Sequence, residues 1–239
     1  MNRKLPVLIL TGALACAVFS PALAAGVTPA ATPIAPRSAA EEVPALPHSV
    51  LYYGTVQEIL REEDGTPVQL YLESEAFGEY VMNLSEQTAW IDSGNRRTAD
   101  PADLEVGQSV YVFHSPVATL SLPPQSAAFA VVSNLPMDAC AAQLHKVEQV
   151  SLEDGRLRIT TDNGGLYLTA DENSTVTRYG SDQAAALEDI QPGCQVIAWY
   201  SAVAQSYPGQ AYTTHLMLLP QAEEPAAAQE AESLIPLEP

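Results

Sequence analysis

The sequence has few residues of the kinds that carry enzyme chemistry. Its 239 residues include four histidines and three cysteines, and these form no His-x-x-x-His or Cys-x-x-Cys pattern of the kind that binds zinc. A glycine-rich phosphate loop and a Gly-x-Ser-x-Gly elbow are also missing. A nucleophile needs a base, and the base needs an orienting group. We therefore expect a protein that is not an enzyme, with no catalytic residues and no cofactor.

One pair of histidines allows an alternative. His145 and His215 both fall in the C-terminal part of the chain, and Glu148 follows the first of them closely. If the two imidazoles met, they would form a divalent-metal site with the carboxylate. Half-buried strand histidines are the simpler interpretation, because the usual ligand spacing is absent. The other two histidines, His48 and His114, lie in no recognisable catalytic arrangement, so no metal is expected.

Basic residues are scarce. The chain has 10 lysines and arginines against 29 acidic residues, a net charge of −19. If Arg3 and Lys4 leave with a signal peptide, eight basic residues face the same 29 acidic ones, and the net charge is −21. Such a surface repels nucleic acid and anionic membranes. The acidic residues lack the alternating spacing of a calcium-binding loop. We therefore interpret them as residues that keep the protein soluble.

Long apolar runs are missing except at the start of the chain. Residues 1–25 have a basic start, an apolar run and the small-residue pattern Ala22-Leu23-Ala24, which predicts a signal peptide. The run is too short for a stable transmembrane helix. Lipid attachment at Cys16 is disfavoured because its aliphatic neighbour, Leu14, is one place too close. We expect a secreted, extracellular protein without a transmembrane segment once mature.

Cysteine use leaves one question open. After cleavage Cys140 and Cys194 remain, and an even count in an exported chain permits a disulfide. Spacing alone does not show that the two Cα atoms come within bonding range. A bonded pair and two separate thiols therefore both remain possible.

Two segments have the composition of disordered chain. Residues 26–48 are rich in alanine and proline, and residues 221–239 are an acidic, alanine-rich tail. Neither has the apolar content needed to offset the entropy cost of ordering. The first is interpreted as a flexible linker and the second as a disordered tail.

The chain carries one stretch twice. Residues 103–117 return as residues 189–203, and further matches precede and follow both copies in the same order. The similarity extends over roughly 80 residues, a length typical of one small domain. Ordered matches of this length argue against chance similarity between strand-rich segments. We predict a duplication that gives two units, residues 49–136 and 143–220.

Both units have the pattern of short strands. Asp64-Gly65 and Asp154-Gly155 are hairpin turn signals, β-branched and aromatic residues flank them, and no sustained helical period occurs. An all-β fold follows, with two tandem small OB-like β-barrels. The strand expected at 109–114 is apolar on both faces, so something must cover its outer face. The candidates are a neighbouring loop or the sister unit.

A loop of the form Ser-x-Pro-x-Gln follows each copy of the repeated stretch. A glutamine amide both donates and accepts hydrogen bonds, so paired loops of this kind suit ligand contact. The alternative is structural: proline fixes the turn, and serine and glutamine satisfy backbone groups. Tyr212 is a further candidate contact. The candidate binding residues are Ser121, Pro123, Gln125, Ser206, Tyr207, Pro208 and Gln210.

These patterns resemble a known group. The positions Asp103, Gly107 and Val110 with the segment 121–125 are similar to the OB-like barrel repeats of uncharacterised exported proteins of anaerobic Gram-positive bacteria. In that group such repeats often precede a domain like the N-terminal domain of copper amine oxidases, which this sequence does not show after Pro220. The resemblance supplies no catalytic residues.

The function expected from the sequence is non-enzymatic. We expect a monomeric binding or spacer protein at or outside the cell envelope, with an unknown envelope or extracellular ligand and no nucleic-acid partner. A secreted hydrolase with a site between the units is the main alternative. A third is an inhibitor of extracellular peptidases that inserts one of the two proline loops.

Overall fold

The computed structural model describes residues 46–137, here called the first half, and residues 141–220, the second half. Several sequence predictions concern parts of the chain outside these residues: the signal peptide (1–25), nearly all of the linker (26–48), the tail (221–239), Cys16 and Cys140. The predicted disulfide therefore has one partner that is not described. Within the described ranges no helix has the length and apolarity needed to cross a membrane.

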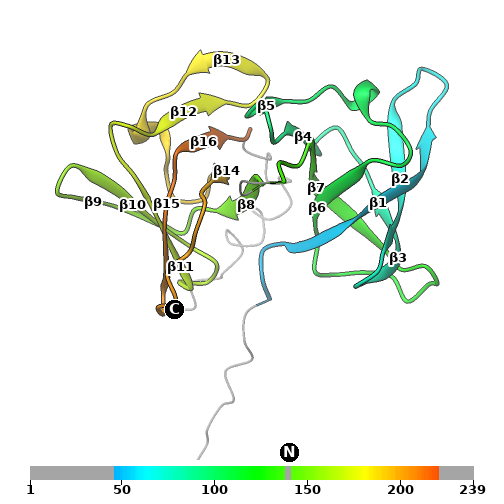
Figure 1. Cartoon of the computed structure of the whole chain (residues 1–239), viewed down its shortest axis with the longest axis horizontal. Helices are drawn as coiled ribbons and strands as arrows, with labels where there is room; N and C mark the ends of the chain where they lie inside the picture. Colours follow the sequence, from blue (N-terminus) through cyan, green and yellow to red (C-terminus); the bar gives the residue numbers. More distant parts are fainter. Residues whose placement is uncertain (1–45, 138–140, 221–239) are drawn as a thin grey trace, which may run out of the picture. The chain divides into compact units, whose positions relative to one another are not determined.

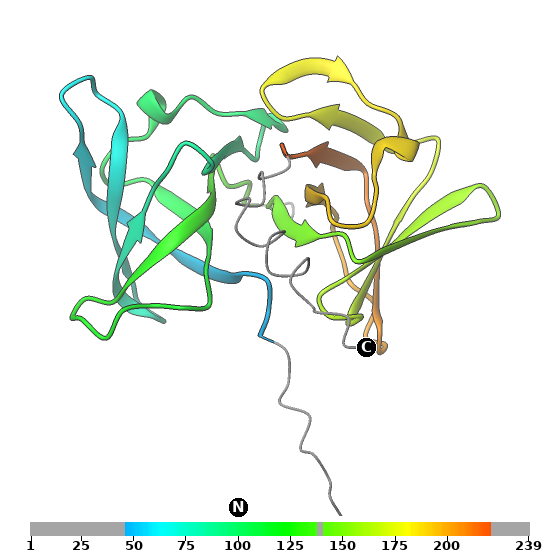
Figure 2. The ribbon, with the colours of Figure 1, turned by 180° about the vertical axis from the view of Figure 1, so that it is seen from behind.

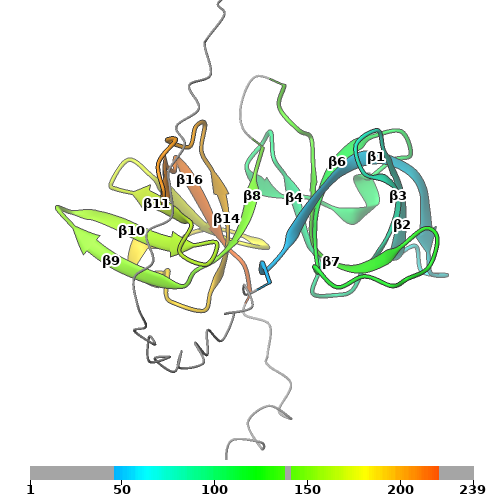
Figure 3. The same ribbon diagram turned by 90° about the horizontal axis from the view of Figure 1, so that it is seen from below.

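The first half is built from seven strands and one short 3₁₀ turn. In chain order these are β1 (Val50–Arg61), β2 (Pro67–Ser74), β3 (Gly78–Asn83), β4 (Ala89–Asp92), β5 (Arg97–Thr98), η1 (Pro101–Asp103), β6 (Ser109–His114) and β7 (Gln125–Ser133). The sheet order is β3-β2-β1-β6-β7-β4-β5, with a further parallel pairing of β3 with β7. That pairing closes β1, β2, β3, β7 and β6 into a five-stranded barrel (Figure 3).

A single long strand makes the closure possible. The N-terminal part of β1 pairs with β6 and its C-terminal part pairs with β2, with a register shift after Val56. A bulge of this kind bends a strand and increases its twist. The turn to β2 contains Gly65 at φ +90°, and the Asp64 carboxylate accepts a hydrogen bond from Thr66 N at 2.9 Å. The hairpin predicted at Asp64-Gly65 is thus confirmed (Figure 1).

The second half has nine strands in two sheets. In chain order the elements are β8 (Gln143–Lys146), β9 (Gln149–Glu153), β10 (Arg156–Thr161), β11 (Leu166–Ala170), β12 (Thr175–Arg178), β13 (Ser181–Ala184), η2 (Leu187–Asp189), β14 (Gln195–Trp199), β15 (Gly209–Tyr212) and β16 (His215–Leu218). One sheet has the order β15-β11-β10-β9 and the other β13-β12-β16-β14-β8. The yellow β12–β13 hairpin is seen from behind in Figure 2.

Short breaks separate the two sheets. β8 ends before Val147 and β9 begins after Glu148, whose N–H donates to Thr160 O at 2.9 Å. At the other break, between β15 and β16, Thr213 N donates to Thr169 O at 2.8 Å. Hydrogen bonding therefore continues across both breaks.

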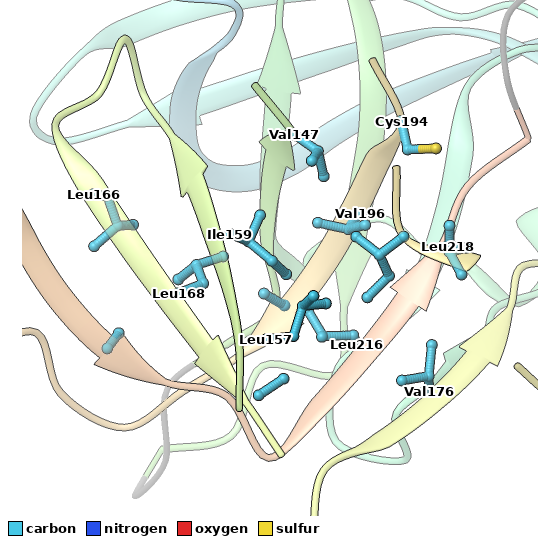
Figure 4. Packing of buried hydrophobic residues seen from close by; sticks show 14 residues of the cluster. Val147, Leu157, Ile159, Leu166, Leu168, Val176, Cys194, Val196, Leu216 and Leu218 are labelled. Carbon is cyan, nitrogen blue, oxygen red and sulfur yellow. The ribbon is translucent and has the colours of Figure 1, made fainter. Parts of the chain in front are cut away.

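Each half has its own core. The barrel interior contains Tyr52, Val56, Leu70, Leu72, Met82, Trp90, Leu104, Val110, Val112, Ala128 and Val131. In the second half, apolar side chains from β10, β11, β14 and β16 point toward one another, as Figure 4 shows. Ile159, Leu168, Val196 and Leu216 are fully buried there.

A third hydrophobic cluster covers the outer face of β6, for which the sequence predicted either a loop or the sister unit as the cover. Its buried members come from both halves: Ala89, Ile91, Phe113, Ala130, Val132, Ala142, Leu144, Ile197, Trp199, Met217 and Leu219. Val110 and Val112 face the barrel interior, whereas Phe113 on the same strand packs in this shared cluster. The second half, and not the proline loop, therefore covers the outer face of β6.

The glycines of the repeated stretch have the same conformation. Gly107 has φ +91° and Gly193 has φ +92°, in a region that residues with a Cβ atom rarely adopt. The N–H of each donates a hydrogen bond of 2.8 Å to a valine carbonyl, at Val56 and Val147. Each glycine thereby holds the start of the strand that follows it, β6 or β14, beside the first strand of its half.

Candidate functional site

The first proline loop connects β6 to β7 and is held by its own hydroxyl groups. Ser121 Oγ donates to Pro123 O at 2.7 Å and lies 2.7 Å from Thr119 Oγ1. Thr119 Oγ1 also accepts from Gln125 N at 2.9 Å, and Thr119 N donates to Gln125 O. The Leu122–Pro123 peptide bond is cis. This network fixes the base of the loop, and Val81 N of β3 adds a hydrogen bond of 2.9 Å to Pro124 O.

The second loop, between β14 and β15, repeats the central contact. Ser206 Oγ donates to Pro208 O at 2.7 Å, and the Tyr207–Pro208 bond is again cis. Ala204 N donates to Gln210 O at 2.8 Å, the counterpart of the Thr119–Gln125 pair. The structural role predicted for the serines is therefore found in both loops.

Apolar side chains project from the tips of these loops. Leu122 is 97% exposed and Tyr207 is 87% exposed, and each directly precedes the cis proline. Leu120 is fully exposed as well. The prolines themselves are half-buried. The loops thus present apolar groups to solvent from a hydrogen-bonded base, which favours contact with a partner over packing within the chain.

The two glutamines take part in the loops through their main chains. Gln125 and Gln210 use their backbone groups within the loops, but their side-chain amides make no hydrogen bond with any described residue. In the structural alternative glutamine satisfies backbone groups, and both residues do so here through their main-chain carbonyls. Each amide is left available to a ligand, with two donors and one acceptor oxygen.

Aromatic side chains close the barrel end beside the first loop. The Tyr80 ring lies 5.5 Å from Tyr52 and 5.0 Å from His114, and the Tyr52 ring lies 5.8 Å from the exposed Phe77. Burial, with the nearby carboxylates of β2 and β3, raises the pKa of Tyr52 to about 12. Burial also lowers the pKa of His114, although its hydrogen bond to Ser115 O opposes this. Both groups therefore stay neutral at physiological pH, and the aromatic cluster at this end of the barrel carries no charge.

The corresponding end of the second half is polar. His145 Nδ1 lies 3.2 Å from Asp162 Oδ1, and His145 Nε2 lies 3.1 Å from the Tyr200 hydroxyl. Burial alone would raise the pKa of Asp162, but hydrogen bonds from His145 and Thr161 and the charge of His145 outweigh it and lower the pKa. A carboxylate, an imidazole and a phenol therefore form a hydrogen-bonded chain.

This chain lies next to the second loop. The β10–β11 turn that carries Asp162 continues to Gly165, whose carbonyl accepts a hydrogen bond from Gly209 N at 2.8 Å. Tyr200 is at the other end of the loop, directly after β14. The His145 chain and the Tyr207 tip thus belong to one region.

The two histidines considered as a metal pair make separate contacts. His145 contacts Asp162 and Tyr200, whereas His215 Nε2 lies 3.2 Å from Thr177 Oγ1. The Glu148 carboxylate accepts backbone N–H bonds from the β10–β11 turn instead. Across the described ranges no group of three or more histidine, cysteine or acidic residues could hold a metal ion.

Sequence reasoning found part of this region. It selected Tyr207, which is exposed, and Tyr212, whose hydroxyl donates to Asp171 Oδ1 at 2.8 Å. It missed the roles of Leu122 and of Asp162, which has φ +58° in its turn. The sequence did contain a signal for Leu122, because it directly precedes Pro123 just as Tyr207 directly precedes Pro208. Cys194, a candidate for a disulfide, is buried in the core of the second half.

Comparison with known proteins gives no family. No protein-family model matches the chain, and no curated protein matches its sequence. The function must therefore be argued from the loops and the groups beside them.

Proposed function

We propose that the protein is a non-enzymatic, exported binding or spacer protein that contacts a ligand at or outside the cell envelope through its two proline loops. The observation that carries the proposal is the matched exposure of Leu122 and Tyr207 on loops whose glutamine amides have no partner among the described residues. An apolar tip and a free amide, on a loop fixed by its own hydrogen bonds, lose little conformational entropy on binding.

We also propose that the second half is a second OB-like barrel, produced by duplication. Support comes from the glycines Gly107 and Gly193 and from the matched serine–proline bonds. The pairings correspond as well: β3 and β4 are both parallel to β7, β11 is parallel to β15, and β12 is parallel to β16. The resemblance to repeats of exported proteins from anaerobic Gram-positive bacteria agrees with this proposal and with secretion.

The position of the loops within the barrel order supports a binding role. The closed order β1-β2-β3-β7-β6 corresponds to strands 1-2-3-5-4 of an OB-fold, so the β6–β7 loop takes the place of the loop between strands 4 and 5. In OB-folds that loop and the face of strands 2 and 3 contact ligands. The strongly acidic composition argues against nucleic acid as the ligand.

A hydrolase is the second candidate. The observation in its favour is the Asp162–His145–Tyr200 chain, in which a carboxylate orients an imidazole that contacts a hydroxyl group. The hollows lined by both halves have no histidine among their described lining residues. The inhibitor alternative remains compatible with the exposed tips of the loops.

The test is a pull-down from cell-wall and culture fractions with the mature protein and with a Gln125→Ala, Gln210→Ala variant. We expect the variant to retain at least tenfold less material. A Gln87→Ala variant, changed at an exposed glutamine that belongs to neither loop, is the control and should behave as the wild type. Equal retention by all three proteins would end the loop proposal. Hydrolysis of a cell-wall substrate that disappears in a His145→Gln variant would favour the hydrolase.

A further inference from the structure

A hollow of about 410 Å³ is lined by residues from both halves. The first half contributes both residues of β5 and the residue before it, and the second half contributes one residue each from β12, the turn after it, β13 and β16. The lining residues are Arg96, Arg97, Thr98, Thr177, Gly180, Ser181 and Met217. Its volume is in the range of pockets that hold small ligands.

The charge of this hollow is opposite to that of the chain. Two arginines line it, and none of its described lining residues is acidic, although the chain has 29 acidic residues and only 10 basic ones. A larger hollow of about 730 Å³ on the first half, by contrast, is lined by three carboxylates, Asp92, Asp100 and Asp103, and by one of the same arginines, Arg97. Among their described lining residues, basic groups therefore outnumber acidic ones only in the smaller hollow.

The two arginines are held differently. Arg97 Nε lies 3.3 Å from Asp92 Oδ2, which fixes that side chain and neutralises part of its charge. Arg96 makes no hydrogen bond or ion pair with any described residue. Its φ of +55° places it in the turn that enters β5, where Asn95 N donates to the same Asp92 carboxylate at 3.1 Å. The Arg97 guanidinium is thus held by Asp92, whereas no described carboxylate pairs with the Arg96 guanidinium.

Two hydroxyl groups add donors to the hollow. Thr98 Oγ1 accepts a hydrogen bond from Gly180 N at 2.8 Å, and Ser181 Oγ accepts one from Gln183 N at 3.1 Å. Because each oxygen is already an acceptor, its own O–H is available to donate to a ligand. The Thr98–Gly180 bond also joins the two halves at this point.

A hollow with two guanidinium groups and two free hydroxyl donors suits an anion with several acceptor oxygens. Planar guanidinium groups bind phosphate and carboxylate oxygens through charge-assisted, often bidentate, hydrogen bonds. We propose that this hollow is a binding site for a tetrahedral oxyanion, either phosphate or sulfate as the free ion or the same group as a monoester on a larger molecule. The bound group would contact Arg96 and Arg97 from one half and Ser181 from the other.

A neighbouring histidine provides a reporter for the site. The His215 side chain is buried beneath Thr177, and burial, with the charge of Arg96 as a second cause, lowers its pKa to about 4. A bound anion would offset the Arg96 charge. The His215 pKa should then rise on binding, whereas binding elsewhere on the protein leaves it unchanged.

The experiment follows histidine resonances by NMR in the mature protein. Inorganic phosphate, sulfate and glucose 6-phosphate are titrated at constant ionic strength in chloride. We expect saturable shifts and a higher His215 pKa. Tighter binding of the monoester assigns the site to a group on a larger molecule, and tighter binding of inorganic phosphate or sulfate assigns it to the free ion. A lack of saturation by any of them up to about 20 mM overturns the proposal.

Variants locate the site. Arg96→Gln should weaken binding at least tenfold, and Arg96→Lys, which keeps the charge but loses the planar fork, should weaken it less. Arg156→Gln removes an exposed arginine that lines neither hollow and is the control, with unchanged binding expected. Ser181→Ala is a second test should the Arg96 variants fold poorly. Equal binding by Arg96→Gln and the control would also overturn the proposal.

Discussion

The indole Nε1 of Trp199 donates a 3.1 Å hydrogen bond to the carbonyl oxygen of Ser93. Trp199 ends β14 in the second half, and Ser93 directly follows β4 in the first half. The Ser93 hydroxyl oxygen in turn accepts from Ala142 N at 2.9 Å. One residue of the first half is therefore bonded to two segments of the second, within a cluster of buried apolar side chains from both. Neither half can separate without exposing these groups.

Removal of the indole donor should reveal the strength of this junction. In Trp199→Phe the buried Ser93 carbonyl loses its partner, and an unsatisfied buried acceptor costs about 1–3 kcal/mol. The ring also becomes smaller, so a second tryptophan is needed for comparison.

Trp90→Phe is the matched control, because the Trp90 indole has no hydrogen bond among the described residues. Urea unfolding of both variants should show the larger loss for Trp199→Phe. A larger loss for Trp90→Phe would contradict the importance of the Trp199–Ser93 bond. Two separate unfolding transitions in the wild type would contradict the shared core.

The turn glycines give a second prediction. No atom lies within 4 Å of a Cβ built on Gly107 or Gly193, so only the backbone conformation opposes a side chain there. Alanine at either position should cost roughly 1–2 kcal/mol in the free energy of unfolding. Asparagine, which tolerates positive φ better, should cost less at both. Thermal unfolding of the four variants checks this, and a loss at one position only would show that the two turns are not equivalent.

Much of the fold was predictable from local patterns. The hairpin turn at Asp64-Gly65 and the apolar alternation of β2 identify the first strands, because turn chemistry and period-two burial act over a few residues. The two-sided apolar pattern of β6 indicated that both faces are covered. What covers the outer face was not predictable, because Trp199 meets Ser93 across 106 residues of chain.

The candidate site was less predictable than the strands. Spacing around the prolines identified both loops, but it did not show which side chains face solvent or that the Gln125 side chain has no hydrogen-bond partner in the described part of the chain. The contact of His145 with Asp162 and Tyr200 depends on three separate segments meeting at one end of the second half. That Arg96 and Ser181 line the same hollow likewise depends on how the halves pack.

The third prediction concerns pH. His215 is 6% exposed and its pKa is lowered from 6.5 to about 4, by burial first and by Arg96 second. Below pH 6.5 the unfolded chain binds a proton that the folded chain does not bind until about pH 4. The contribution of neutral His215 to stability is therefore complete above pH 6.5 and is lost as the pH falls toward 4.

At about 1.4 kcal/mol per pKa unit, this loss amounts to roughly 3 kcal/mol. A His215→Gln variant cannot take up the proton, so it should lose less stability than the wild type between pH 7 and pH 4.5. Urea unfolding at the two pH values measures the difference. Parallel losses in both proteins would show that His215 titrates in the folded state near its ordinary pKa.

The most direct test of the binding proposal is site-specific photo-crosslinking. A benzoylphenylalanine is placed at position 122, at position 207, or at position 106, where an exposed valine lies away from both loops, and each mature protein is irradiated with envelope and culture fractions. The proposal predicts that positions 122 and 207 capture the same material and that position 106 does not. Capture of nothing from the two loops, or of the same material from all three positions, would contradict it.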